Sequence, residues 1–140
     1  MAPLKTYIVE DSPVIRENLI ATLEELGPVQ VVGWAADEAG ALRWLADPGN
    51  HATLVIVDIF LKSGSGLGVL RQAAKRPHGP RMVVLSNYAT ADVRTKCLEL
   101  GAERVFDKSG DIDDLLVYCQ GLATGAPNGA AGAASLPPAA

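Results

Sequence analysis

The sequence predicts an α/β domain in which a parallel sheet carries helices on both faces. Two observations lead to this fold class. Five short runs rich in β-branched residues alternate with five segments whose apolar residues recur at helical spacing, and such alternation gives parallel strands joined by right-handed crossovers. The third run, residues 54–57, is apolar at every position, which is typical of a central strand that is covered on both sides.

The first half of the chain alternates strand and helix signals twice. The run over residues 6–9 stops at an acidic pair, after which Ser12 and Pro13 are residue types of a helix N-cap and a first helical position. Apolar residues then recur at helical spacing until Gly27-Pro28, where a helix would end. In residues 29–35 we expect a regular period of two. The expected elements are strands over 6–9 and 29–35 and helices over 13–26 and 37–46.

The second half of the chain continues the same alternation of strands and helices. A Gly- and Ser-containing loop, residues 62–66, comes between the apolar third strand and the next helix, and Gly101 closes the fourth helical segment. The expected elements are a strand over 54–57, a helix with apolar residues at 67, 70 and 74, a strand over 81–85, a helix with apolar residues at 93, 97 and 100, a strand over 104–106, and a helix with apolar residues at 112, 115, 116 and 119.

Polar residues follow four of the five predicted strands at the point where each strand ends. Glu10 and Asp11 come after the first strand, Asp58 after the third, Ser86 after the fourth and Lys108 after the fifth. The carboxyl ends of parallel strands share one edge of the sheet, and ligands of open α/β sheets bind there. We therefore expect these five residues to form one site.

The residue types at this edge suit metal-assisted phosphoryl transfer. Three carboxylates repel one another unless a cation is present, and oxygen ligands favour a small hard cation such as Mg²⁺. Asp58 ends the most buried strand, so it is the natural nucleophile, and attack on phosphorus would give an aspartyl phosphate. Lys108 would supply a cation and Ser86 a hydroxyl donor for the phosphoryl oxygens.

These five residues, in this order and spacing, resemble the receiver domain of bacterial two-component response regulators, the CheY-like superfamily. The resemblance extends over about residues 5 to 122. The segment Phe106-Asp-Lys-Ser109 is similar to that of short stand-alone regulators. The resemblance implies a flavodoxin-like, doubly wound, five-stranded parallel sheet with strand order 2-1-3-4-5 and helices on both faces.

The resemblance also implies what each site residue does. A sensor histidine kinase or a phosphotransfer protein would give its phosphoryl group to Asp58. Lys108 and Ser86 would contact that group. The site would hold Mg²⁺, and the implied ligands are Glu10, Asp11, Asp58 and the main-chain carbonyl of Phe60. Gly66 matches the glycine of the loop that follows the acceptor.

Phosphorylation would act as a switch, because two added negative charges shift a conformational equilibrium. By resemblance, the face formed by the fourth helix, the fifth strand and the fifth helix would bind a downstream protein partner or a second phosphorylated copy. The chain departs from the family at Val105, where an aromatic residue is common, and at Lys62 and Ser109, where proline is common. We also hypothesise that Phe60 and Tyr88 limit water access and set the lifetime of the phosphoryl group.

The composition is that of one globular domain. The chain has 140 residues, of which 49% are apolar and 20% are charged, enough for a single core. We assign residues 1–122 to a receiver domain and residues 123–140, which are uncharged and rich in Ala, Gly and Pro, to a flexible tail. Cys97 and Cys119 occupy apolar helical positions and are predicted to be buried free thiols.

Charge and hydropathy argue against several classes of partner. A net charge of −4 argues against direct binding to nucleic acid. No apolar run approaches the roughly 20 residues that span a bilayer, and the first residues lack the features of a signal peptide. We therefore expect a cytoplasmic protein that binds neither nucleic acid nor membrane.

Three alternatives are weighed against a stand-alone receiver. A phosphatase or mutase with an aspartyl nucleophile would need a second Asp two residues after Asp58, where Phe60 stands. A flavin carrier would need a phosphate-binding loop after the first strand, where the acidic pair would repel phosphate. The third alternative is the amino-terminal receiver of a DNA-binding transcriptional regulator, and it stays open. The domain itself is not expected to be an enzyme beyond catalysing its own phosphorylation and dephosphorylation.

Overall fold

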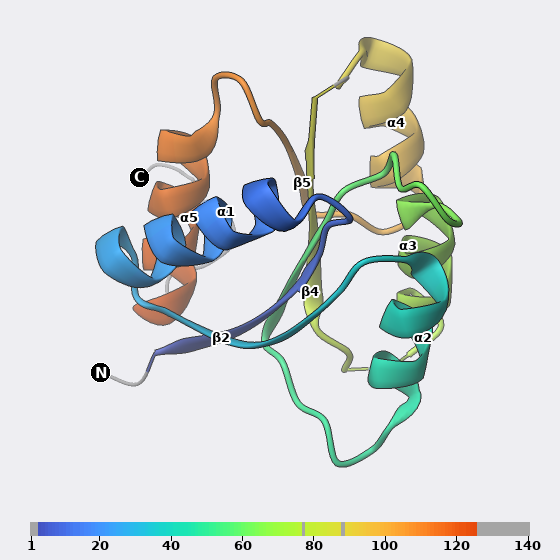
Figure 1. The fold of residues 1–140 in the computed structure, drawn as a ribbon, viewed down its shortest axis with the longest axis horizontal. Helices are drawn as coiled ribbons and strands as arrows, with labels where there is room; N and C mark the ends of the chain where they lie inside the picture. The colour runs from blue at the N-terminus through green and yellow to red at the C-terminus, as the bar shows by residue number, and fades with distance from the viewer. Residues whose placement is uncertain (1–2, 77, 88, 126–140) are drawn as a thin grey trace.

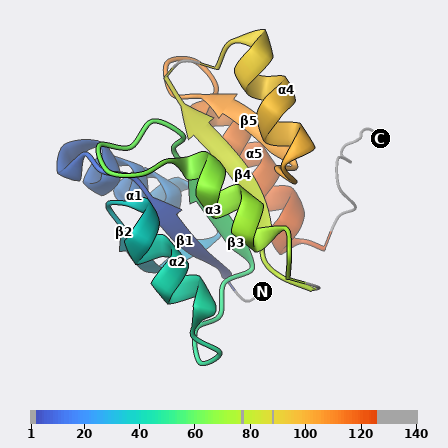
Figure 2. The same cartoon turned by 90° about the vertical axis from the view of Figure 1, so that its right-hand side faces the viewer.

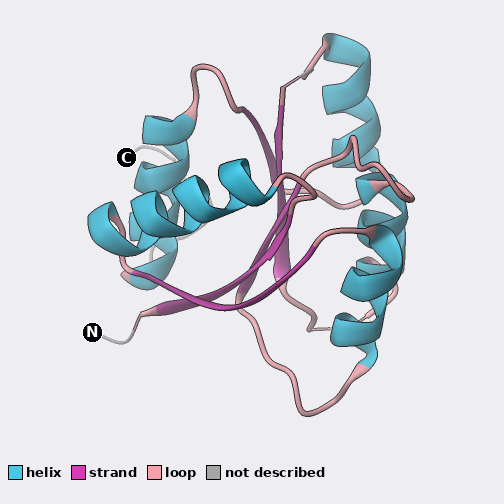
Figure 3. Ribbon diagram, in the orientation of Figure 1, coloured by secondary structure: helices cyan, strands magenta, loops and turns pink. Residues whose placement is uncertain are grey.

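The computed structural model describes residues 3–76, 78–87 and 89–125, which form one parallel sheet and its covering helices. The strand order is β2-β1-β3-β4-β5, which confirms the predicted fold class and order. Figures 1 and 3 show the strands in the middle of the molecule with helices on either side. The elements are β1 (Leu4–Val9), α1 (Pro13–Leu26), β2 (Val29–Ala35), α2 (Glu38–Ala46), β3 (Leu54–Val57), α3 (Gly66–Ala73), β4 (Arg81–Ser86), α4 (Ala91–Glu99), β5 (Arg104–Asp107) and α5 (Ile112–Ala123).

Helices cover both faces of the sheet, and each face has its own apolar core. Helices α1 and α5 lie on one face, and α2, α3 and α4 lie on the other (Figures 1 and 2). On the α1–α5 face the buried residues include Leu19, Leu23 and Leu115. On the opposite face they include Val69 and Cys97. All four residues of β3 are buried, as the apolar run 54–57 predicts.

Local sequence signals explain most helix boundaries. The Ser12 hydroxyl accepts a hydrogen bond from the Ile15 backbone nitrogen at 3.3 Å, and Pro13 follows as the first helical residue. Helix α3 ends at Ala73, so Ala74 caps the helix and is exposed, contrary to the expectation that it packs as part of the helix. Gly101 follows α4 with a φ of +107°, a left-handed conformation that glycine adopts without strain.

Strand β2 departs from the regular period expected for residues 29–35. Thr6 pairs with Val31 while Tyr7 pairs with Gly33, so Val32 is an extra residue opposite β1, as in a β-bulge. Tyr7 is buried and stacks on Trp44 with ring centroids 4.0 Å apart. A side chain at residue 33 would lie 3.1 Å from the Tyr7 ring, so this glycine leaves room for the stack.

Three further predictions concern the cysteines, the end of the last helix and membrane spans. Cys97 and Cys119 are buried and free, which confirms that prediction. Helix α5 continues to Ala123, and from residue 126 onward the predicted tail lies outside the described residues. Within the described residues, no helix has both the length and the apolar character needed to cross a membrane.

Candidate active site

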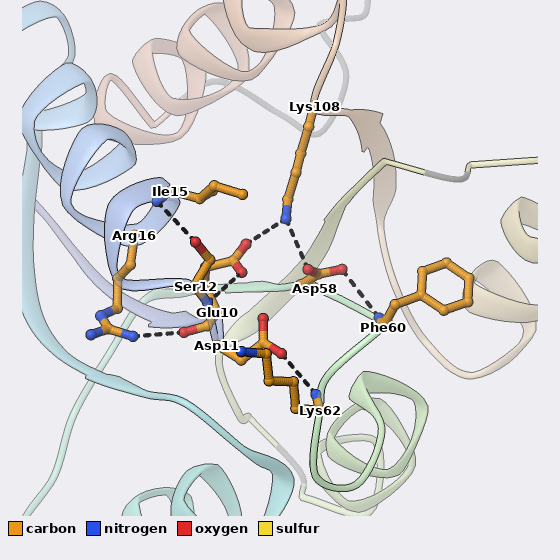
Figure 4. Close-up of polar contacts among 9 residues, drawn as sticks. All are labelled: Glu10, Asp11, Ser12, Ile15, Arg16, Asp58, Phe60, Lys62 and Lys108. Atoms are coloured by element: carbon orange, nitrogen blue, oxygen red, sulfur yellow. Dashed lines mark hydrogen bonds and ion pairs between the residues drawn. The ribbon is translucent and has the colours of Figure 1, made fainter.

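The polar residues after the strands meet at the carboxyl edge of the sheet, as predicted. Strand β3 lies between β1 and β4, with Val57 opposite both Val9 and Val84. The Asp58 backbone nitrogen donates to the Val9 carbonyl at 3.0 Å, so Asp58 and Glu10 leave adjacent strands side by side (Figure 4).

Three carboxylates form a compact acidic cluster at this edge. One oxygen each from Glu10, Asp11 and Asp58 lies within 4.8 Å of the others. Glu10 is 2% exposed and Asp58 is 6% exposed, so two of the three charges are shielded from water. Hard oxygen donors at this spacing fit a small divalent cation that keeps several of its own waters.

Lys108 provides a cation within this cluster. Its ammonium group donates to Glu10 Oε1 at 2.5 Å and to Asp58 Oδ2 at 2.8 Å (Figure 4). Burial alone would lower the pKa of Lys108, but the hydrogen bonds to Asp58 and Glu10 outweigh it and raise that pKa. Lys108 is therefore charged at neutral pH. Its place near Asp58 agrees with the prediction from the strand ends, whereas its pairing with Glu10 was not predicted.

Glu10 is the most strongly enclosed of the three acids. Burial raises the pKa of Glu10, and the hydrogen bonds from Lys108 and from the Ser12 backbone nitrogen offset this only in part. The Ser12 nitrogen lies 3.1 Å from Glu10 Oε2. Both carboxylate oxygens of Glu10 thus have a hydrogen-bond partner in this structure. A metal ion bound by Glu10 would either share the carboxylate with Lys108 or displace the ammonium group.

Arg16, which was not among the predicted site residues, contacts the main chain of the acidic pair. Its guanidinium donates to the Glu10 carbonyl at 2.9 Å and stacks 3.7 Å from the centroid of the Trp34 ring. Arg16 is 8% exposed although it carries a charge. An arginine on the first turn of an expected helix looks like a solvent-exposed residue, so no sequence signal could have revealed this role.

Ser86 ends β4 with its hydroxyl inside the protein. Its side chain is fully buried, and Oγ has no hydrogen-bond partner among the described residues. Its main-chain carbonyl accepts a hydrogen bond from the Lys108 backbone nitrogen at 3.1 Å, and this bond joins the ends of β4 and β5. Because buried hydroxyls are normally paired, the Ser86 hydroxyl is available to a group that enters the site.

The loop after β3 is tied to two of the carboxylates. The Phe60 nitrogen donates to Asp58 Oδ1 at 3.1 Å, and the Lys62 nitrogen donates to Asp11 Oδ2 at 2.7 Å (Figure 4). Gly66 closes the loop, and a Cβ there would collide with the Asp58 carbonyl oxygen and lie 2.7 Å from Val57. The resemblance singled out this glycine, and its close contact with backbone gives the physical reason.

Two residues at which the chain departs from the family pattern, Val105 and Ser109, have defined positions, and so does the Phe60 ring of the hypothesis on phosphoryl lifetime. The Phe60 ring is 49% exposed and points away from the carboxylates (Figure 4). Val105 is buried in the core beneath α4. The Ser109 hydroxyl donates to Asp107 Oδ1 at 2.5 Å, and this hydrogen bond lowers the pKa of Asp107. Tyr88, paired with Phe60 in the hypothesis on phosphoryl lifetime, lies outside the described residues.

A groove of about 270 Å³ opens beside Lys108 between α1 and α5. Ile15 and Leu19 line it from α1, and Ile112 lines it from α5. Val14, on the same first turn of α1, is 69% exposed. An apolar surface therefore adjoins the polar site.

Comparison with known proteins identifies the family of the chain. Residues 6–120 match the response regulator receiver domain. A methylesterase and glutaminase of Hahella chejuensis is 35% identical over 107 residues, which are 75% of this chain and 30% of that protein. A probable transcriptional regulatory protein of Picosynechococcus is 32% identical over 123 residues, which are 84% of this chain and 48% of that protein.

Solved structures agree on the fold. The isolated receiver domain of RcsB from Salmonella enterica, in the presence of the phosphomimetic BeF₃⁻, matches with a TM-score of 0.76 and 23% identity, over 89% of this chain and 91% of that chain. A LuxR-family regulator from Aurantimonas matches with a TM-score of 0.78 and 22% identity, over 89% and 88% of the two chains. The chain spans only 30% to 48% of the length of three curated relatives that it matches.

Proposed function

The chain belongs to the response regulator receiver family and is a phosphoacceptor switch, and from that premise we propose that Asp58 accepts the phosphoryl group. A carboxylate oxygen of Asp58 attacks the phosphorus of a phosphohistidine. An oxygen–phosphorus bond forms while the nitrogen–phosphorus bond breaks, and the imidazole nitrogen keeps the electron pair. The 6% exposure of Asp58 supports this role, since little bulk water reaches the acyl phosphate that results.

Lys108 and Ser86 orient and neutralise the group that arrives. Lys108 already contacts Asp58 Oδ2 at 2.8 Å, so its ammonium group is available to a phosphoryl oxygen attached there. The buried hydroxyl of Ser86, which has no partner among the described residues, donates a hydrogen bond to another phosphoryl oxygen. Both contacts strengthen as negative charge develops, which is the requirement for electrostatic catalysis.

Glu10, Asp11 and Asp58 would hold a divalent cation, with the Phe60 carbonyl as a further ligand. The three carboxylate oxygens lie within 4.8 Å of one another, which supports this ligand set. Mg²⁺ suits it because Mg²⁺ binds proteins through one or two carboxylates and retains waters. When bound, the ion neutralises charge shared between the acceptor and the phosphoryl oxygens. Arg16 fixes the main chain of Glu10 and so keeps the acidic pair in place.

The phosphodonor, a histidine kinase or a phosphotransfer protein, docks over the groove between α1 and α5. The groove reaches Lys108 and is lined by Ile15, Leu19 and Ile112. An apolar helix seated there would bring its histidine to the polar edge of the sheet. We place this exchange in the cytoplasm, where ATP-dependent kinases act. The chemistry proposed for the domain is limited to its own phosphorylation and dephosphorylation.

The observation that carries this proposal is the pairing of buried Asp58 with Lys108, together with a buried Ser86 hydroxyl that no described residue contacts by a hydrogen bond. The test is to incubate the purified chain with acetyl phosphate and Mg²⁺ and to record its intact mass. We expect a gain of one phosphoryl group that requires the metal. Asp58→Asn should gain none, and Asp47→Asn, a change in the turn after α2, should behave as the wild type.

A second experiment is needed in case the site accepts a phosphoryl group from its own kinase alone and not from acetyl phosphate. Titration with beryllofluoride and Mg²⁺, followed by amide chemical shifts, should perturb residues around Asp58 and Ser86. If acetyl phosphate adds no mass and beryllofluoride shifts no amide near Asp58, the proposal is wrong. The chain would then be a receiver fold that serves as a docking module.

A second candidate concerns the output. Several curated relatives are named transcriptional regulatory proteins, and one of them is covered over 48% of its length. We propose as the alternative that this domain is the receiver of a DNA-binding regulator, with a phosphorylation-dependent homodimer as its active form. The net charge of −4 argues against DNA binding by this chain itself. Light scattering with and without beryllofluoride tests the dimer.

A further inference from the structure

Glu38 connects the first turn of α2 to the loop that follows β3. Its carboxylate Oε1 accepts a hydrogen bond from the Ser65 backbone nitrogen at 2.8 Å, and its own backbone nitrogen donates to the Ser63 carbonyl at 3.3 Å. Helices α2 and α3 lie side by side in Figures 1 and 2. The side chain therefore joins two segments that are 27 residues apart in the sequence.

Two glycines leave the space that the Glu38 side chain fills. A Cβ at Gly64 would lie 2.5 Å from Glu38 Cβ, and a Cβ at Gly68 would collide with the Glu38 carboxylate. Gly64 has a φ of +80°, so its backbone alone favours glycine. Gly68 lies within α3, where alanine is ordinarily preferred over glycine. The visible reason for glycine at residue 68 is the carboxylate of Glu38.

The loop held by Glu38 is the loop that reaches the acidic cluster. Phe60 forms an antiparallel bridge with Ser65, so the residue that Glu38 holds is paired with the residue that follows Asp58 by two. Between them, the Lys62 nitrogen donates to Asp11. Fixing Ser65 thus fixes the main chain at Phe60 and the hydrogen bond that orients Asp11.

We propose that Glu38 is a positioning residue for the metal-binding and phosphoacceptor site, acting through the loop of residues 59–65. This inference rests on the proposed function, because it concerns the same site. Groups that orient metal ligands from outside the ligand set change metal affinity by about 10- to 100-fold when they are removed. Loss of the Glu38 carboxylate therefore weakens Mg²⁺ binding without removing any ligand.

The first test measures Mg²⁺ affinity by isothermal titration calorimetry on the unphosphorylated chain. Glu38→Ala should raise the Mg²⁺ Kd about tenfold. Glu38→Gln keeps an oxygen acceptor for Ser65 and should stay within about threefold of the wild type. Glu17→Ala, an exposed acid on α1, is the matched control and should leave the Kd unchanged.

Phosphorylation kinetics separate positioning from loss of stability. With acetyl phosphate as donor, Glu38→Ala should need about tenfold more Mg²⁺ for half-maximal rate, while the rate at saturating Mg²⁺ stays close to that of the wild type. A destabilised but correctly arranged chain would lose active fraction at every Mg²⁺ concentration instead. If the wild type is phosphorylated and Glu38→Ala shows the same Mg²⁺ dependence of the rate, the inference is overturned and the proposed function still stands.

The glycines supply a second, independent variant. Gly68→Ala should displace the Glu38 carboxylate and raise the Mg²⁺ Kd to the level of Glu38→Ala. In the Glu38→Ala background the same change should add nothing, because the collision is gone. This double-mutant cycle separates displacement of the Glu38 carboxylate from any independent effect of the new methyl group. Additive effects of the two changes, or a Kd in Glu38→Ala within threefold of the wild type, would overturn the inference.

Discussion

Replacing Lys108 with methionine removes the cation between Glu10 and Asp58 and keeps an unbranched side chain. The Lys108 side chain is 11% exposed, and the side chains of Glu10 and Asp58 are 3% and 8% exposed. Removing one partner of a buried ion pair costs about 3 to 5 kcal/mol. We expect about 3 kcal/mol at pH 7.5 in this case, because the site lies at an edge of the sheet where water reaches the lysine.

The pH dependence of this cost has a definite sign. Burial already raises the pKa of Glu10, and losing the ammonium group would raise that pKa further. A carboxyl whose folded pKa is raised contributes stability below its unfolded pKa and loses that stability as pH rises through its folded pKa. The cost of Lys108→Met should therefore be small below the ordinary pKa of 4.5 and grow as the pH rises.

A divalent cation should replace the missing charge. Binding to the folded chain at 100 times Kd adds about 2.7 kcal/mol, and Lys108→Met should bind Mg²⁺ more tightly than the wild type because the ammonium group no longer competes for Glu10 and Asp58. The assay is urea unfolding followed by circular dichroism, with and without Mg²⁺, at pH 4.5, 6 and 7.5. Exposed Lys75→Met serves as control and should change stability by less than about 0.5 kcal/mol.

The reasoning would be refuted by a Lys108→Met chain as stable as the wild type at pH 7.5 without Mg²⁺. A cost that shrinks as the pH rises would refute it equally, because the two carboxylates would then not be the source. In phosphorylation assays Lys108→Ala should still take a phosphoryl group on Asp58 and lose most of the conformational response. A full response measured by amide shifts would contradict the role given to Lys108.

Three further predictions use the same assays. The wild-type free energy of unfolding should fall as pH rises through the raised folded pKa of Glu10, and Glu10→Gln should lack that slope; parallel curves would contradict the burial argument. Ser86→Ala should change stability by less than about 1 kcal/mol, because it removes a buried hydroxyl that has no partner in the described part of the chain, yet it should slow phosphorylation; an unchanged rate would count against a role for the hydroxyl. Gly66→Ala should lower the free energy of unfolding by about 1 to 3 kcal/mol, because the new Cβ collides with backbone. Gly110→Ala, with open space around it, should be nearly neutral. Equal effects of the two changes would show that the loop moves to accommodate the Cβ at residue 66.

Much of the site was predictable because it depends on strand ends. A polar residue directly after a parallel strand lies at a known edge of the sheet, so Asp58 and Lys108 could be brought together from residue order alone. The fold followed from the same alternation, since the chain connectivity of βαβ units leaves few topologies.

The remaining features depend on contacts between helices, loops and edge strands. Nothing near Glu38 indicates that its carboxylate reaches Ser65, because that contact exists only once α2 packs against α3. The bulge at Val32 was missed for a similar reason. A valine suits either face of an edge strand, so its pattern does not reveal which residue is left unpaired.

The stack of Trp34 on Arg16 makes the molecule its own optical probe. The chain has two tryptophans: Trp44 is stacked on buried Tyr7, whereas Trp34 is 51% exposed and rests on the guanidinium that holds the Glu10 carbonyl. Any movement of the acidic pair that shifts Arg16 alters the surroundings of the Trp34 indole. The intrinsic fluorescence thus reports events at the site in solution without a label, and comparison with Trp34→Phe would isolate the contribution of Trp34.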